Sequence, residues 1–97
     1  MINEILPEAL KARLDANERI VLLDVRQPEE HAEENIPNSI LIPLGELPAR
    51  IAELEPHRND EIIVYCRSGN RSGQACMLLQ MLGFTNPVNL HGGMLAW

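Results

Sequence analysis

The residues in this sequence with the clearest chemical potential are Cys66 and two arginines close behind it, Arg67 and Arg71. Between the arginines lie three small or polar residues that tolerate unusual backbone angles: Ser68, Gly69 and Asn70. Such a loop can turn its amide N–H groups toward one point, and these donors stabilise a negative charge together with the guanidinium groups. We therefore expect Cys66 to be a thiolate nucleophile at neutral pH, rather than a buried structural cysteine.

The spacing of this loop separates two kinds of chemistry. Protein-tyrosine-type phosphatases place five residues between cysteine and arginine, and their loop encloses a tetrahedral phosphate. Here four residues separate Cys66 from Arg71, so the loop forms a tighter cradle. That size suits a sulfur atom attached to the cysteine better than a phosphoryl group, and it disfavours a phosphatase.

Charge is distributed unevenly along the chain, whose formal net charge is −6. All 14 carboxylates lie in residues 1–61, whereas the charges of residues 62–97 are Arg67 and Arg71 alone. A local positive field in an acidic protein favours a small anionic ligand next to Cys66. The overall acidity argues against nucleic acid as a partner.

Length and composition limit the possibilities further. Ninety-seven residues are enough for one domain, 1–97, built around a single core. No apolar run is long enough to span a membrane, and the first residues lack the features of a secretory signal. Two cysteines without a histidine at zinc-ligand spacing predict neither a disulfide scaffold nor a metal site. Free thiols suit a reducing compartment, so we expect a cytoplasmic protein.

Apolar runs alternate with segments of helical periodicity. The expected order is helix 7–16, strand 20–24, helix 28–34, strand 40–42, helix 44–54, strand 62–65, helix 71–82, strand 87–90 and a final segment 92–97. Short apolar strands separated by helices predict an α/β fold, a small parallel β-sheet with helices on both faces. Ligands of such sheets bind beyond the carboxyl ends of the strands, which is where Cys66 lies.

Four segments in the correct order resemble the signatures of the rhodanese-like domain family. They are Leu23-Asp24-Val25-Arg26 with Glu30, Ile36-Pro37 with Ile42-Pro43-Leu44, Val64 through Ser72, and Leu90-His91-Gly92-Gly93-Met94 with Ala96-Trp97. Glu34-Asn35 and Asn38-Ser39 replace the Gly-His and Gly-Ala pairs usual in the family, and they can still form the turn. The resemblance covers nearly the whole chain and implies the three-layer rhodanese-like fold. Because family members usually continue beyond the position of Trp97, we expect either a short version of the domain or one truncated in its C-terminal helix.

The resemblance also implies a sulfurtransferase reaction in two steps. The Cys66 thiolate takes a sulfane sulfur from a small anionic donor such as thiosulfate, and the persulfide then passes it to a thiol or cyanide acceptor. Arg67 and Arg71 are the expected electrostatic partners of donor and persulfide. The backbone amides of the remaining loop residues complete the expected binding site: Ser68, Gly69, Asn70 and Ser72. No cofactor is needed.

Supporting roles are expected for two residues at the end of a neighbouring strand, Asp24 and Arg26. Arg26 is expected to pair with Glu30, and Asp24 is a candidate for holding the cysteine loop through its N–H groups. Cys76 is expected to pack in the core rather than to resolve the persulfide. The histidines are expected at the surface: His31, His57 and His91.

Three functional classes follow from this loop. The first is an enzyme that uses thiosulfate or a related donor, and the second is a persulfide carrier or sulfur-relay protein with a protein partner. The third is a non-catalytic binding module. The presence of Cys66 together with both arginines argues against the third class, while the first two use the same persulfide and stay open.

Overall fold

The computed structural model describes residues 2–97, so that Met1 of the predicted domain lies outside the described residues. These residues form a five-stranded sheet in the order β1-β5-β4-β2-β3, and all neighbouring strands are parallel. The strands are β1 (Asn3–Ile5), β2 (Val21–Asp24), β3 (Ile40–Leu41), β4 (Glu61–Tyr65) and β5 (Asn86–Leu90). The predicted parallel α/β architecture is confirmed.

The helices are α1 (Pro7–Asp15), α2 (Pro28–Glu33), α3 (Leu47–Arg50) and α4 (Asn70–Met81), with 3-10 segments η1 (Leu44–Glu46), η2 (Ile51–His57) and η3 (Gly93–Ala96). The expected continuous helix 44–54 is wrong, because η1, α3 and η2 replace it. Pro48 and Pro56 lie in this stretch, and a proline has no amide hydrogen to donate to an α-helical ladder. Among residues 2–97, no helix has both the length and the apolar character needed to cross a membrane.

Strand β1 is absent from the sequence-based prediction. It is three residues long and occupies the edge of the sheet, where it pairs with β5 from Val88 to Leu90. Two of its three residues are exposed, so the segment has no alternation of apolar and polar residues for a pattern to detect. Its position matters for the site, because it brings Glu4 next to β5.

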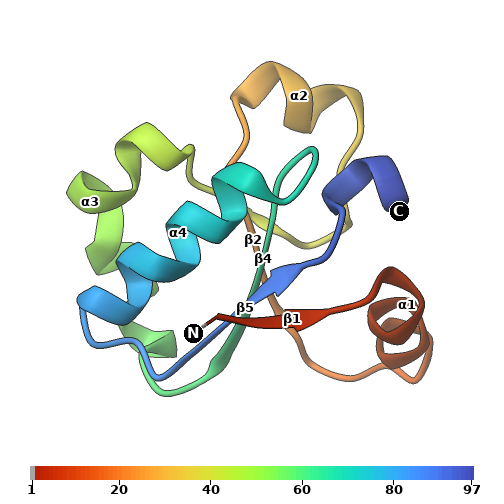
Figure 1. The fold of residues 1–97 in the computed structure, drawn as a ribbon, viewed down its shortest axis with the longest axis horizontal. Coiled ribbons are helices and arrows are strands. Elements are labelled where there is room, and N and C mark those ends of the chain that lie inside the picture. Colours follow the sequence, from red (N-terminus) through yellow and green to blue (C-terminus); the bar gives the residue numbers. More distant parts are fainter. Residues whose placement is uncertain (1) are drawn as a thin grey trace.

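Side chains alternate across the sheet and build two cores. Ile62 and Val64 of β4 pack on the face covered by α3 and α4, whereas Ile63 and Tyr65 pack on the opposite face with Leu10 of α1. Figure 1 shows α3 and α4 on one side of the sheet, and α1 with the C-terminal segment on the other. Because both faces of β2 and β4 are covered, these strands read as continuous apolar runs.

Candidate active site

Cys66 follows directly after the central strand β4, at the carboxyl ends of the parallel strands. The loop from Cys66 to Gly69 connects this strand to α4. Cys66 is only 1% exposed, and it packs against the core that α4 covers. The sequence-based placement of the cysteine at the ligand-binding edge of the sheet agrees with this position.

Three hydrogen-bond partners surround the Cys66 sulfur. The amide of Gly69 donates to Sγ at 3.1 Å, the amide of Ser72 donates at 3.4 Å, and the Ser72 hydroxyl lies 3.3 Å away. Gly69 adopts a φ of +104°, a conformation that L side chains rarely adopt, and this turns the chain into the first turn of α4. The loop therefore concentrates donors on one sulfur atom.

The surroundings of Cys66 act in opposite directions on its ionisation. Burial raises the pKa of the thiol, but hydrogen bonds from the Ser72 hydroxyl and from the amides of Ser72, Gly69 and Ser68 outweigh it. The net result is a pKa below the ordinary thiol value. Hydrogen bonding to the charged form is the physical reason, and it makes the thiolate more accessible near neutral pH.

The C-terminal segment is hydrogen-bonded to the backbone of the cysteine loop. The amides of Met94 and Leu95 donate to the carbonyl oxygens of Cys66 and Arg67, each at 2.9 Å. Gly93 has a φ of +57°, and a Cβ atom there would lie 2.4 Å from the carbonyl oxygen of Cys66. The close contact and the positive φ together require glycine at position 93.

Arg71 pairs with Glu30 of α2 rather than pointing freely into the loop. Its two terminal nitrogens donate to the two carboxylate oxygens at 2.8 and 2.9 Å. These bonds lower the pKa of Glu30 to about 2. The expected pairing of Glu30 with Arg26 is wrong, because Arg71 takes that position and so ties α4 to α2.

Arg26 forms a buried ion pair with Asp24 instead. Its Nη2 lies 2.8 Å from Asp24 Oδ2, and His31 Nδ1 lies 2.9 Å from the same oxygen. Burial raises the pKa of Asp24, but hydrogen bonds from Arg26 and His31 outweigh it and lower the pKa. Asp24 thus ties the end of β2 to Arg26 and to His31 of α2, and the hydrogen bonds to the cysteine loop for which it was a candidate are not among its contacts within residues 2–97. His31 is half-buried rather than a simple surface residue.

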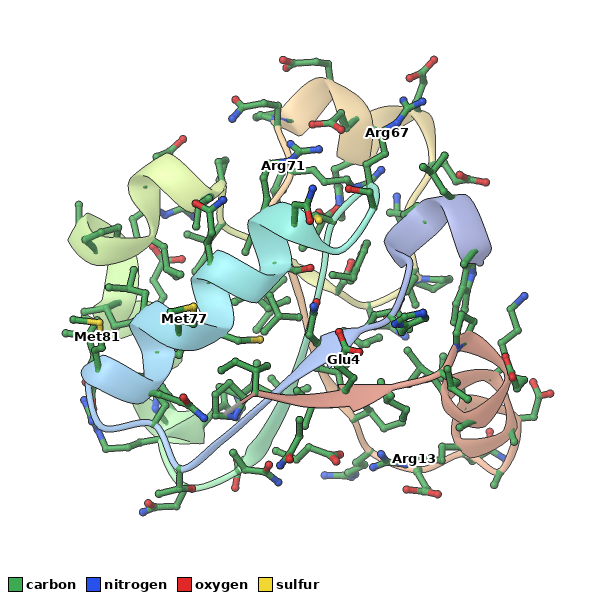
Figure 2. The ribbon with its side chains drawn as sticks, viewed as in Figure 1. Glu4, Arg13, Arg67, Arg71, Met77 and Met81 are labelled. Atoms are coloured by element: carbon green, nitrogen blue, oxygen red, sulfur yellow. The ribbon has the colours of Figure 1, made fainter. Side chains whose placement is uncertain are left out.

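A cavity of about 360 Å³ opens beside the cysteine loop. Its walls carry two arginines, three glutamates and two apolar side chains: Arg26, Arg67, Glu30, Glu33, Glu34, Met94 and Leu95. Arg67 is exposed, and Figure 2 shows it with Arg71 at the end of the molecule that α2 occupies. The cavity wall therefore includes Arg67, the residue after Cys66, while the buried Cys66 is not among the lining residues.

Cys76 occupies the buried face of α4 and is fully buried. Burial is the main reason that its pKa rises to about 12, and the nearby negative charge of an ionised Cys66 adds to this. The predicted core position is confirmed, and a thiol with this pKa is protonated at neutral pH.

Sequence reasoning missed three parts of this site. It gave Ser72 a role through its backbone, whereas the hydroxyl also contacts the sulfur and donates to Asn89 Oδ1 at 2.5 Å. Asn89 and Glu4 were not identified. Asn89 carried a detectable signal, because a polar residue between the apolar residues Val88 and Leu90 near the end of a strand is a candidate buried polar group that needs partners.

Comparison with known proteins supports this description. The model of the family "Rhodanese-like domain" matches residues 6–97. A "Sulfurtransferase" of Allochromatium vinosum is 41% identical over 97 residues, which cover 100% of this chain and 89% of that protein. "Thiosulfate sulfurtransferase PspE" of Escherichia coli is 43% identical over 70 residues, 72% of this chain and 67% of that protein. The crystal structure of a rhodanese-like domain protein from Staphylococcus aureus superposes with a TM-score of 0.91 at 32% identity, covering 99% of this chain and 91% of that one.

Proposed function

Because this chain belongs to the rhodanese-like domain family, we propose that it transfers a sulfane sulfur from an anionic donor such as thiosulfate to a thiol or cyanide, through a persulfide on Cys66. The observation that carries the proposal is the set of loop donors around one sulfur, with the Gly69 amide at 3.1 Å and the Ser72 amide at 3.4 Å. Two relatives with sulfurtransferase in their names give independent support.

In the first step, an electron pair of the Cys66 thiolate attacks the outer sulfur of thiosulfate. A new S–S bond forms, the S–S bond of the donor breaks, and sulfite leaves with its electron pair. Cys66 then carries a persulfide whose terminal sulfur is anionic. The proposed step uses no separate general base, because the loop donors lower the pKa of the Cys66 thiol.

In the second step, the acceptor attacks the terminal sulfur of the persulfide. Cyanide becomes thiocyanate, or a thiolate becomes a persulfide, and the electron pair of the broken bond returns to Cys66 as a thiolate. Each step transfers one sulfur atom, so the cycle restores the starting cysteine without an external oxidant or reductant.

The loop amides and arginines have separable roles in this scheme. The N–H groups of the loop bind the anionic terminal sulfur in the way an oxyanion hole binds oxygen, and the loop residues concerned are Ser68, Gly69, Asn70 and Ser72. Arg67, exposed at the cavity wall, attracts the dianionic donor. Arg71 contributes a positive field at Cys66 that its ion pair with Glu30 reduces.

A persulfide carrier that is loaded and unloaded by protein partners uses the same cysteine and the same donors. The cavity next to Arg67 offers Met94 and Leu95 together with carboxylates, a surface that a protein acceptor contacts more fully than cyanide does. Both versions need Cys66 in its reduced form, which a reducing compartment such as the cytoplasm supplies.

Intact-mass spectrometry after incubation with thiosulfate tests the proposal directly. We expect the wild type and Cys76→Ala to gain one sulfur atom, and Cys66→Ala to gain none. A wild type that gains no sulfur from thiosulfate, polysulfide or a cysteine desulfurase would refute it. Thiocyanate formation with thiosulfate and cyanide supports the enzyme, whereas loading by the desulfurase alone supports the carrier. Hydrolysis of an aryl phosphate by the wild type, lost in Cys66→Ala, would instead indicate a phosphatase.

A further inference from the structure

The hydroxyl of Ser72 has two possible acceptors and a single proton. Asn89 Oδ1 lies 2.5 Å from Ser72 Oγ, and Cys66 Sγ lies 3.3 Å from it. A serine hydroxyl donates one hydrogen bond at a time. When it donates to Asn89, its oxygen can accept the S–H of Cys66, but it cannot stabilise a thiolate. The two acceptors therefore compete for the same proton.

The orientation of the Asn89 side chain is fixed by its other end. Nδ2 donates to the carbonyl oxygen of Gly69 at 3.1 Å and to Glu4 Oε2 at 3.3 Å. An amide nitrogen in this position requires the amide oxygen to face Ser72. Asn89 is only 6% exposed, so its oxygen has little access to water when the serine proton turns away. The same amide also ties β5 to the cysteine loop through Gly69.

Glu4 extends this chain of hydrogen bonds to the surface. Its second carboxylate oxygen, Oε1, lies 3.1 Å from His91 Nδ1, and Glu4 comes from the edge strand β1. Figure 2 shows Glu4 beside β5. The chain therefore runs from an exposed pair, through Asn89 and the Ser72 hydroxyl, to the buried sulfur.

We propose that Asn89 is a positioning residue for Cys66, holding the Ser72 hydroxyl proton when the cysteine is a thiol or a persulfide and releasing it to the sulfur when the cysteine is a thiolate. The change is a rotation of one O–H group, so no covalent bond forms or breaks. The thiol proton itself goes to solvent when Cys66 ionises. The part that concerns the persulfide rests on the proposed function, whereas the part that concerns the thiol and thiolate does not.

The hydrogen bonds among Cys66, Ser72 and Asn89 differ between the thiol, thiolate and persulfide states of the cysteine. In the thiol, S–H donates to Ser72 Oγ and the serine donates to Asn89, so every group has a partner. In the thiolate, the serine turns to Sγ and the buried oxygen of Asn89 loses its donor, which disfavours this state. In the persulfide, the negative charge moves to the terminal sulfur, and the serine can return to Asn89. Asn89 thus favours the loaded enzyme over the free thiolate.

Other ionisable groups around this network must be held constant in any test. Arg71 and Cys76 lie on α4, Glu4 on β1 and His91 after β5, and Arg67 and Asp24 are further charges near the loop. A double-mutant cycle compares the wild type, the Ser72 variant, the Asn89 variant and the double variant, and these ionisable groups are present in all four proteins. Additive contributions from them cancel in the coupling between the two substitutions.

The thiolate of Cys66 is titrated by its ultraviolet absorbance and by the pH dependence of iodoacetamide alkylation, in the absence of any sulfur donor. We expect Asn89→Leu to lower the midpoint by about 0.5 to 1 pH unit, because the serine then donates freely to the sulfur. Ser72→Ala should raise the midpoint. In the Ser72→Ala background, Asn89→Leu should change it by less than about 0.2 pH unit, since no hydroxyl remains to be shared.

An unchanged or raised midpoint in Asn89→Leu would overturn the proposal, and so would an equal shift in both backgrounds. If Asn89→Leu does not fold, the wild type provides a second measurement. The side-chain amide NMR signals of Asn89 should shift with the same midpoint as Cys66, and this shift should be absent in Ser72→Ala. The proposal of a shared proton would be contradicted if the Asn89 signals did not shift with the ionisation of Cys66. It would also be contradicted if they shifted equally in Ser72→Ala.

The persulfide part has its own test. At a fixed ratio of thiosulfate to sulfite, above the pH at which Cys66 ionises, the ratio of persulfide to free thiolate should fall about three- to tenfold in Asn89→Leu, which is the expected titration shift expressed as an equilibrium ratio. An unchanged ratio would overturn this part. If the wild type takes up no sulfur while the titrations behave as expected, the proposed function fails and the shared proton stands.

Discussion

Arg71 and Glu30 form a two-point ion pair that joins the first turn of α4 to α2, with nitrogen–oxygen distances of 2.8 and 2.9 Å. The same arginine interacts electrostatically with Cys66, and the negative sulfur helps to raise the pKa of its guanidinium. The ion pair therefore sets how much positive charge the sulfur experiences. Glu30 reduces the field of Arg71, while it also fixes the arginine in place.

Substitutions of the two partners should move the ionisation of Cys66 in opposite directions. We expect Arg71→Ala to raise the thiolate midpoint by less than about 1 pH unit, because a positive charge is lost and Glu30 is left uncompensated. Glu30→Gln should lower it, since the charge of Arg71 is no longer balanced. Titration of the two variants by thiolate absorbance checks this, and shifts of the same sign would show that loop distortion, not charge, dominates.

The ion pair should also make stability depend on acidity. The pKa of Glu30 is lowered from 4.5 to about 2 in the folded protein, so the pair contributes stability that is fully present above about pH 4.5 and lost as the pH falls toward 2. Because both side chains are about one-third exposed, we expect about 0.5 to 1 kcal/mol. Urea unfolding at several pH values should show this component in the wild type and not in Glu30→Gln. An equal pH dependence in the two proteins would contradict it.

Glycine at position 93 should be essential for the shape of the loop. In Gly93→Ala, the new Cβ would lie 2.4 Å from the carbonyl oxygen of Cys66 and 2.6 Å from the carbonyl of Arg67, at a φ of +57°. We expect a loss of about 2 to 4 kcal/mol in the free energy of unfolding, together with a loss of sulfur uptake. Gly45→Ala is the matched control, because nothing lies within 4 Å of its Cβ. Its stability should stay within about 0.5 kcal/mol of the wild type.

The elements that hold the site could be predicted from local patterns. The apolar runs before Asp24 and Cys66 indicated strands buried on both faces, and their order fixed a parallel sheet with the cysteine at its carboxyl edge. The loop composition predicted the convergence of amides on the sulfur. The division of residues 44–57 into three short segments was harder to predict, because one apolar periodicity continues through it, and Pro48 at the start of α3 and Pro56 inside η2 each remove an amide donor.

The side-chain partners could not be predicted, because they come from elements far apart in the sequence. Glu30 lies 41 positions from Arg71, and Glu4 lies 85 positions from Asn89. Two carboxylates, Asp24 and Glu30, lie close to Arg26 in the sequence. The bend of the chain between β2 and α2 decides that Arg26 forms its ion pair with Asp24. A three-residue edge strand that is mostly exposed gives no pattern, so the position of Glu4 depends on the completed sheet.

The two cysteines should differ in every chemical test, although both belong to the same apolar core. Burial raises the pKa of Cys76 to about 12, whereas the loop donors lower that of Cys66, so we expect Cys66 to ionise at lower pH than Cys76 and to be the more reactive thiol. We expect one equivalent of iodoacetamide to react with the native protein, at Cys66, and the second to react only after unfolding. Peptide mapping by mass spectrometry identifies the modified residue.

Replacement of Cys76 separates its packing role from catalysis. Cys76→Ala removes a buried sulfur and should cost about 1 to 2 kcal/mol of stability, because the surrounding core cannot fully close the space. Sulfur uptake at Cys66 should stay within about twofold of the wild type under conditions where the variant is folded, since Cys76 supplies no thiolate. If Cys76→Ala accepted a sulfur atom but failed to release it to a thiol acceptor, Cys76 would be a resolving cysteine despite its burial. Retained transfer to cyanide and thiols in this variant would establish that the cycle needs one cysteine.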